Sequence, residues 1–81
     1  MSKIQIYSTP TCTYCQLAKQ FFGQNNVEYT EFDVAEDLEK RQEMIEKSGQ
    51  MGVPVISIEK DGKSEVIVGF DEDRIRQILS I

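Results

Sequence analysis

The chain has 81 residues, of which 40% are hydrophobic and 28% are charged, and its formal net charge at pH 7 is −5. This length is enough for one domain with a modest core, which we expect to span residues 1–81, and the composition excludes a disordered chain. The acidic balance argues against a nucleic-acid partner, because affinity for phosphate depends on clustered lysine and arginine.

The sequence contains no apolar segment of the kind that targets or crosses a membrane. Residues 1–7 alternate polar and apolar side chains and lack the continuous apolar region of a signal peptide. Elsewhere the longest unbroken apolar runs contain only a few residues, which is far short of a membrane span. We therefore expect a cytoplasmic protein with no membrane partner.

The first half of the chain predicts a strand, a helix and a second strand. Residues 3–8 alternate as a strand does, and Pro10 ends this strand because proline cannot continue a central ladder. From Thr13, apolar residues recur at three- and four-residue spacing until Gly23, which indicates an amphipathic helix. Residues 27–34 then supply the second strand. A βαβ unit of this kind has a right-handed crossover.

The second half predicts a helix, a β-hairpin and a final helix. Residues 35–48 carry acids in their first turn and a lysine in their last, which the helix dipole favours, and Gly49 is the expected C-terminal stop. The strands 55–58 and 65–68 are joined by Asp61-Gly62, a strong hairpin signal, so they should be antiparallel. Asp71 follows as the expected N-cap of the last helix.

Cys12 and Cys15 are the only cysteines, and they stand between the first predicted strand and the first predicted helix. A C-x-x-C pair in this context is typical of a thiol–disulfide redox site. The loop that the pair closes is too short to stabilise a fold. The alternative is half of a zinc site, but zinc takes four ligands, and this chain has no histidine and no third cysteine. We therefore expect a catalytic redox pair and no bound metal.

The two cysteines should have different roles. Cys12 would be the nucleophile, because the unpaired N–H groups and positive dipole at a helix start stabilise a thiolate. Such positions lower the pKa of a thiol from about 8.5 to roughly 3.5–7.5. Cys15, one turn inside the helix and facing the core, would remain a thiol until it attacks the mixed disulfide.

The predicted order of elements is βαβαββα, and no repeat or linker interrupts it. A four-stranded mixed sheet flanked by three helices accommodates every segment and belongs to the α/β class. With a C-x-x-C pair directly after the first strand, this pattern in so short a chain predicts a minimal thioredoxin-like fold.

Four segments are similar to segments of small dithiol glutaredoxins, and together they span nearly the full length. They are the active-site segment 7–15, the helical segment 40–49, Val53-Pro54 and the segment 69–72. The chain therefore resembles a small dithiol glutaredoxin. Its Gly69-Phe70 pair is more similar to the NrdH redoxins, glutaredoxin-like proteins that take electrons from thioredoxin reductase instead of glutathione.

The resemblance implies an oxidoreductase that uses glutathione as reductant or co-substrate and acts on disulfide-containing or glutathionylated proteins. It implies a cis peptide bond at Val53-Pro54, whose backbone would pair with glutathione or a peptide beside the reactive cysteine. Tyr14, Thr9, Phe70 and Asp71 would border this glutathione site, with Asp71 near the γ-glutamyl ammonium.

Several of these residues also have an ordinary structural explanation. Pro54 could simply start a strand, since only about 5–6% of X-Pro bonds in folded proteins are cis. Tyr14 could lie on a helix surface without touching a ligand. Asp71 is a natural N-cap whether or not it contacts glutathione. The sequence alone leaves these readings open.

Three positions depart from the glutaredoxin pattern. Thr13 replaces the proline of Cys-Pro-Tyr-Cys, Thr9 replaces a lysine that contacts the glycine carboxylate of glutathione, and Val68 replaces the second glycine of a Gly-Gly pair. Thr9 and Val68 leave an NrdH-like redoxin reduced by thioredoxin reductase as the first alternative. Thr13 leaves a second alternative, a dimeric carrier of a glutathione-ligated iron–sulfur cluster. We expect a monomeric dithiol glutaredoxin.

Overall fold

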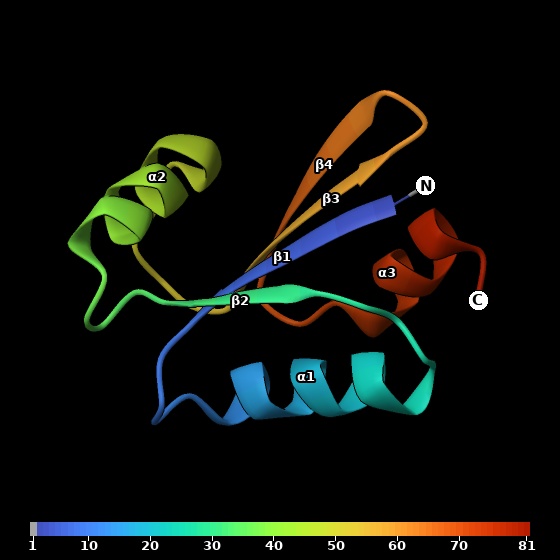
Figure 1. Ribbon diagram of the computed structural model, residues 1–81, viewed down its shortest axis with the longest axis horizontal. Coiled ribbons are helices and arrows are strands. Elements are labelled where there is room, and N and C mark those ends of the chain that lie inside the picture. Colours follow the sequence, from blue (N-terminus) through green and yellow to red (C-terminus); the bar gives the residue numbers. More distant parts are fainter. Residues whose placement is uncertain (1) are drawn as a thin grey trace.

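The chain alternates strands and helices in the predicted order βαβαββα (Figure 1). The computed structural model describes residues 2–81. Its elements are β1 (Ser2–Ser8), α1 (Thr13–Gln24), β2 (Thr30–Asp33), α2 (Leu38–Ser48), β3 (Val55–Lys60), β4 (Lys63–Val68) and α3 (Glu72–Leu79). Within these described residues, no helix combines the length and the apolar composition needed to cross a membrane.

The four strands form one mixed sheet in the order β2-β1-β3-β4. β1 runs parallel to β2 and antiparallel to β3, and β3 runs antiparallel to β4. Tyr7 pairs with Val55, which pairs in turn with Val68, while Ser8 pairs with Asp33. The ends of β1, β2 and β4 and the start of β3 therefore meet at one end of the sheet, and the loop that carries the cysteines begins there.

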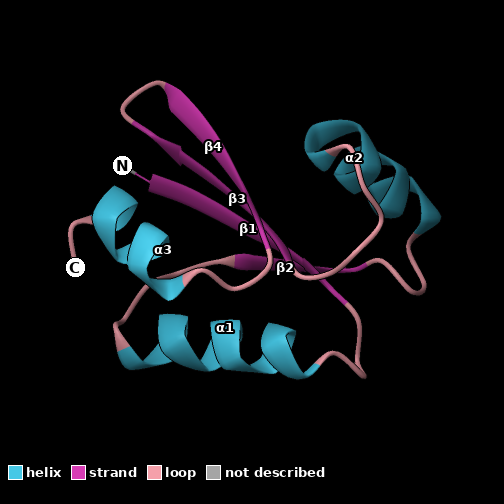
Figure 2. Cartoon of the chain, turned by 180° about the vertical axis from the view of Figure 1, so that it is seen from behind, coloured by secondary structure: helices cyan, strands magenta, loops and turns pink. Residues whose placement is uncertain are grey.

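Helices cover both faces of the sheet, with α1 and α3 on one face and α2 on the other (Figures 1 and 2). Side chains alternate between the two faces along β1, so Ile6 packs toward α1 and α3 whereas Tyr7 packs toward α2. The larger buried cluster comprises Ile4, Ile6, Ala18, Phe21, Phe22, Ile56, Ile58, Ile67 and Ile75. The smaller one comprises Tyr7, Val34, Met44 and Val55.

The predicted caps and turns are confirmed. The Asp71 side chain accepts the Arg74 N–H at 3.2 Å and caps α3. Gly49 ends α2 at φ +73°, in the left-handed region where glycine is favoured. Asp61-Gly62 joins β3 to β4 with φ values of +53° and +78°, as a tight hairpin turn requires.

Two elements are shorter than predicted. The second strand, predicted over 27–34, is paired only over Thr30–Asp33, because the Val27 N–H bonds back to the end of α1 at 2.8 Å. The second helix, predicted from residue 35, begins at Leu38, because the Asp37 side chain accepts a first-turn N–H at 3.1 Å and caps it there. In both cases a local hydrogen bond makes the element begin later than the sequence pattern predicts.

Candidate redox site

The cysteines lie where the loop after β1 enters α1, at the end of the sheet described above. Cys12 and Cys15 are joined by a disulfide, and their Cα atoms are 5.2 Å apart. This is the oxidised state of a dithiol pair. The short loop and the first turn of the helix together bring both sulfurs into bonding range.

Cys12 is the N-cap residue of α1, as predicted. Its backbone is extended, with φ −87° and ψ 112°, and its Sγ accepts the Cys15 N–H at 3.1 Å. The Cys12 N–H donates to the Thr9 carbonyl at 3.3 Å and closes the loop. The first turn of α1, which is wholly within the described residues, contains no acidic side chain. Free N–H groups and the helix dipole therefore act on this sulfur without an opposing carboxylate in that turn.

Cys15 lies one helical turn inside α1 and is 0% exposed, whereas Cys12 is half-buried. The prediction that Cys15 faces the core is therefore confirmed. Ala18 and Phe22 of the same helix are also fully buried. A molecule that approaches from solvent reaches the Cys12 sulfur before it can reach the Cys15 sulfur.

The Val53-Pro54 peptide bond is cis, as the resemblance implied. Pro54 is buried and leads into β3, and its carbonyl accepts the Gly69 N–H at 2.8 Å. The backbone N–H and C=O of Val53 have no hydrogen-bond partner within residues 2–81. The main-chain donor and acceptor of one residue at this end of the sheet are therefore available to pair with a bound chain.

The other residues predicted to border a glutathione site differ in their exposure and in the contacts that they make within the chain. Tyr14 is 63% exposed on the first turn of α1, and Thr9 is half-buried in the loop before it. The Phe70 ring packs 5.7 Å from the Phe21 ring at the edge of the larger core, which accounts for an aromatic residue there. One oxygen of Asp71 is engaged in capping α3.

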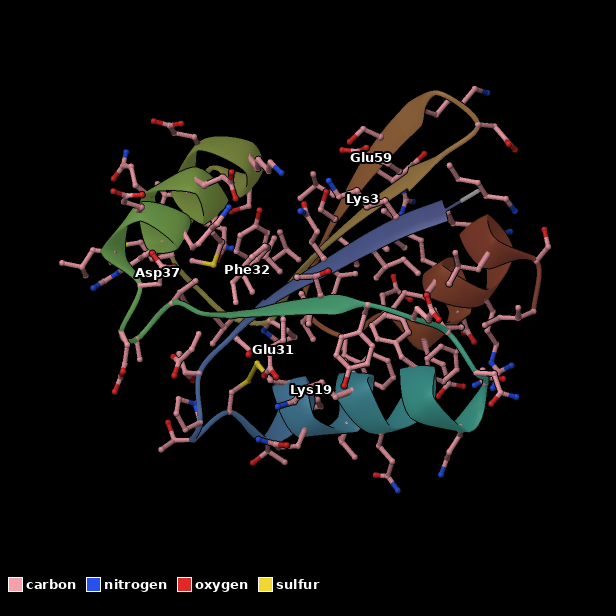
Figure 3. The ribbon with its side chains drawn as sticks, in the orientation of Figure 1. Lys3, Lys19, Glu31, Phe32, Asp37 and Glu59 are labelled. Atoms are coloured by element: carbon pink, nitrogen blue, oxygen red, sulfur yellow. A yellow bond between two sulfur atoms is a disulfide. The ribbon has the colours of Figure 1, made fainter. Side chains whose placement is uncertain are left out.

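A polar network beside the cysteines was not anticipated from the sequence. Glu31 Oε2 accepts a hydrogen bond from Ser8 Oγ at 2.7 Å and pairs with Lys19 Nζ at 2.7 Å. Figure 3 shows the Glu31 and Lys19 side chains meeting between β2 and α1. The hydrogen bonds from Lys19 and then from Ser8 lower the pKa of Glu31 below its usual value, so this carboxylate is charged at neutral pH. The spacing of Cys15 and Lys19 was visible in the sequence, but the partner on β2 was not.

A shallow acidic groove of about 670 Å³ follows the carboxyl end of β2 and the start of α2. We call it the β2–α2 groove, and it is lined by Glu31, Phe32, Asp33, Glu36, Asp37, Leu38 and Glu39. Five of these seven residues are acidic, and Leu38 is 67% exposed. Because Asp33 pairs with Ser8, the groove lies at the same end of the sheet as the cysteine loop. Over residues 2–81, no three metal-ligating side chains gather into a metal site.

Solved structures confirm the predicted thioredoxin-like fold. A single-residue mutant of the thioredoxin-like protein BC3987 superposes with a TM-score of 0.83 and 36% identity, covering 100% of this chain and 99% of that one. The NrdH-redoxin of Escherichia coli gives a TM-score of 0.76 at 24% identity, with 94% and 93% coverage, and shows the fold alone. The fold and the Cys12-x-x-Cys15 disulfide thus define a thioredoxin-like thiol–disulfide oxidoreductase.

Sequence comparison gives the family. The glutaredoxin family model matches residues 4–63. An uncharacterized glutaredoxin-like 8.6 kDa protein in the rubredoxin operon of Clostridium pasteurianum is 42% identical over 76 residues, which cover 94% of this chain and 96% of that protein. Glutaredoxin 3 of Escherichia coli K12 is 37% identical over 59 residues, which cover 73% and 71%. The chain belongs to the glutaredoxin family.

Proposed function

We propose that this chain is a dithiol glutaredoxin that reduces protein disulfides and glutathione mixed disulfides, with Cys12 as nucleophile and Cys15 as resolving thiol. The observation that carries the proposal is the unequal access to the two sulfurs. Cys12 is half-buried at a helix N-cap, and Cys15 is 0% exposed behind it. A substrate disulfide therefore meets Cys12 first, and the helix start favours its thiolate.

The exchange proceeds in two steps. The Cys12 thiolate attacks one sulfur of the substrate disulfide, forms a mixed disulfide and expels the other sulfur as a thiolate, which takes up a proton. Cys15 then gives up its proton and attacks Cys12 Sγ, which releases the second substrate thiol and forms the Cys12–Cys15 disulfide of the oxidised chain. Two electrons pass from the dithiol to the substrate.

In this proposal the substrate backbone pairs with the Val53 N–H and C=O, which have no partner within residues 2–81. An extended chain that runs antiparallel to Val53 gains two main-chain hydrogen bonds, and these hold its sulfur in register. Tyr14 and Val68, which are 63% and 54% exposed, offer apolar contact to the same chain. Asp71 supplies its remaining oxygen to an ammonium group of the ligand.

Two reductants are candidates for regenerating the dithiol. Glutathione is the general reductant of the family, and we propose it first. Thioredoxin reductase is the second candidate, because Thr9 supplies no cation at the family's lysine position and the β2–α2 groove presents five acidic residues. Neither feature attracts the two carboxylates of glutathione. A protein reductase does not depend on such carboxylates to recognise its partner.

The test supplies the oxidised chain with NADPH and either glutathione plus glutathione reductase or thioredoxin reductase alone. NADPH consumption identifies the reductant, and Cys12→Ser should abolish it in both assays. Cys15→Ser should retain reduction of glutathione mixed disulfides and lose reduction of protein disulfides. Loss of both activities in Cys15→Ser would exclude the glutathione route, and a brown dimeric protein would favour the cluster carrier.

A further inference from the structure

We infer that Lys19 and Glu31 are positioning residues that shift the reduction potential of the Cys12–Cys15 pair in opposite directions, so that the native potential depends on the two charges staying paired. The inference rests on the proposed redox function, because it assigns a regulator to the same dithiol. It concerns the equilibrium between disulfide and dithiol, which is measurable whichever substrate or reductant the protein uses.

The network connects β1 and α1, the two elements on either side of the loop that leads to the cysteines. Ser8 is the last residue of β1, directly before the cysteine loop, and it is 1% exposed. Lys19 is four residues after Cys15, so the two side chains lie on one face of α1 with Cβ atoms about 5–6 Å apart. Glu31 Oε2 lies 2.7 Å from both Ser8 Oγ and Lys19 Nζ. A single carboxylate oxygen therefore links the start of the loop to the helical turn that follows Cys15.

Reduction of the disulfide changes the charge at the start of α1. At neutral pH the reduced pair carries a thiolate at Cys12 when the helix start lowers its pKa, whereas the disulfide is neutral. A cation nearby stabilises the reduced state, and an anion destabilises it. In the native protein Lys19 and Glu31 nearly cancel each other, and their 2.7 Å separation makes that cancellation effective.

Other charges near the network are mainly negative. Those that line the β2–α2 groove with Glu31 come from β2, from the turn before α2 and from the first turn of α2: Asp33, Glu36, Asp37 and Glu39. The positive charge that faces Glu31 from α1 is that of Lys19, whose side chain is 19% exposed. Loss of Lys19 should therefore leave the dithiol facing an uncompensated negative field, which disfavours the thiolate.

The test is the reduction potential of three variants, measured by equilibration with glutathione or dithiothreitol redox buffers. Glu31→Gln leaves Lys19 unopposed, so we expect the equilibrium constant for reduction to rise about threefold to tenfold. Lys19→Met leaves Glu31 unopposed, and the constant should fall by a similar factor. The double variant should return to within about twofold of the native protein. For this two-electron couple, a tenfold change corresponds to about 30 mV.

Glu59→Gln is the matched control, since it removes the same charge near the opposite end of the sheet, where Glu59 pairs with Lys3 (Figure 3). It should leave the potential unchanged. If Glu31→Gln does not fold, the comparison of Lys19→Met with the double variant isolates the same charge. Shifts in one direction for both single variants, or no shift, would overturn the inference. A chain with opposite shifts but no disulfide reductase activity would refute only the proposed function.

Discussion

The Tyr7 hydroxyl offers a sharp test of how α2 is held on the sheet. Tyr7 is 0% exposed, and its hydroxyl donates to Glu43 Oε2 at 2.6 Å and accepts from Lys47 Nζ at 3.2 Å. Both partners belong to α2. Tyr7→Phe removes this oxygen and keeps the ring, whose centroid lies 5.3 Å from that of Phe32. The substitution therefore isolates the polar contact from the packing.

The expected loss follows from the charge and exposure of the partner. A hydrogen bond to a charged group contributes about 1.5–3 kcal/mol net. The Glu43 side chain is 37% exposed, so water replaces part of the lost contact, and we expect a loss near 1.5 kcal/mol, the lower end of that range. With a urea m-value of about 1–3 kcal/mol per molar, the unfolding midpoint should fall by roughly 1 M.

The same contact gives stability a pH dependence of known sign. The hydrogen bond from Tyr7 is the largest of the effects that lower the pKa of Glu43. This stabilisation is therefore present above the usual glutamate pKa of about 4.3, and it is lost as the pH falls through the folded-state pKa of Glu43. Burial and Glu43 raise the pKa of Tyr7, so stability also declines as the pH rises above about 10. Tyr7→Phe should lack the alkaline decline and show a weaker acidic one.

Urea unfolding followed by circular dichroism at several pH values measures all of these quantities. Tyr29→Phe is the control, because the Tyr29 ring packs 5.5 Å from the Phe22 ring and its hydroxyl makes no hydrogen bond within residues 2–81. That variant should lose less than about 0.5 kcal/mol. Equal losses in the two variants, or an unchanged pH profile for Tyr7→Phe, would refute the reasoning.

Three further substitutions test the caps and the smaller core. Asp71→Ala should lower the free energy of urea unfolding by about 1 kcal/mol through loss of the α3 cap, and Asp71→Ser should restore most of it if the cap is the cause. Gly49→Ala meets open space at φ +73°, so backbone strain alone should remove about 1 kcal/mol and lower Tm by about 4–8 °C; an unchanged Tm in calorimetry would contradict this. Met44→Ala should destabilise the fold by about 2–5 kcal/mol in urea and Met44→Leu by less than about 1.5, because only the first leaves a cavity beneath α2.

Features governed by neighbouring residues were predictable from the sequence. Asp71, Gly49 and Asp61-Gly62 each act through their own backbone conformation or a bond to a residue nearby, and all three lie where they were expected. The start of α2 was missed because Asp37 competes with Ala35 as the first residue of the helical pattern, and the capping hydrogen bond decides between them.

In the candidate site too, features set by nearby residues were predictable, whereas contacts between separate elements were not. The C-x-x-C spacing and the helix start are local, so the positions of Cys12 and Cys15 followed from the sequence. The Ser8–Glu31–Lys19 network joins three elements, and it depends on the register that places Ile6 opposite Glu31. Sequence periodicity says which face a residue occupies, but it does not give the register between two parallel strands.

The central position of β1 has a consequence for motion at the site. β1 and β3 each pair with strands on both sides, so their amide protons should exchange only through global unfolding, whereas the loops that carry Thr9 and Val53 open locally. The cysteine loop thus directly follows one of the two strands that should exchange most slowly. Substrates can come and go through small loop fluctuations, while the platform beneath the sulfurs keeps its shape from one redox cycle to the next.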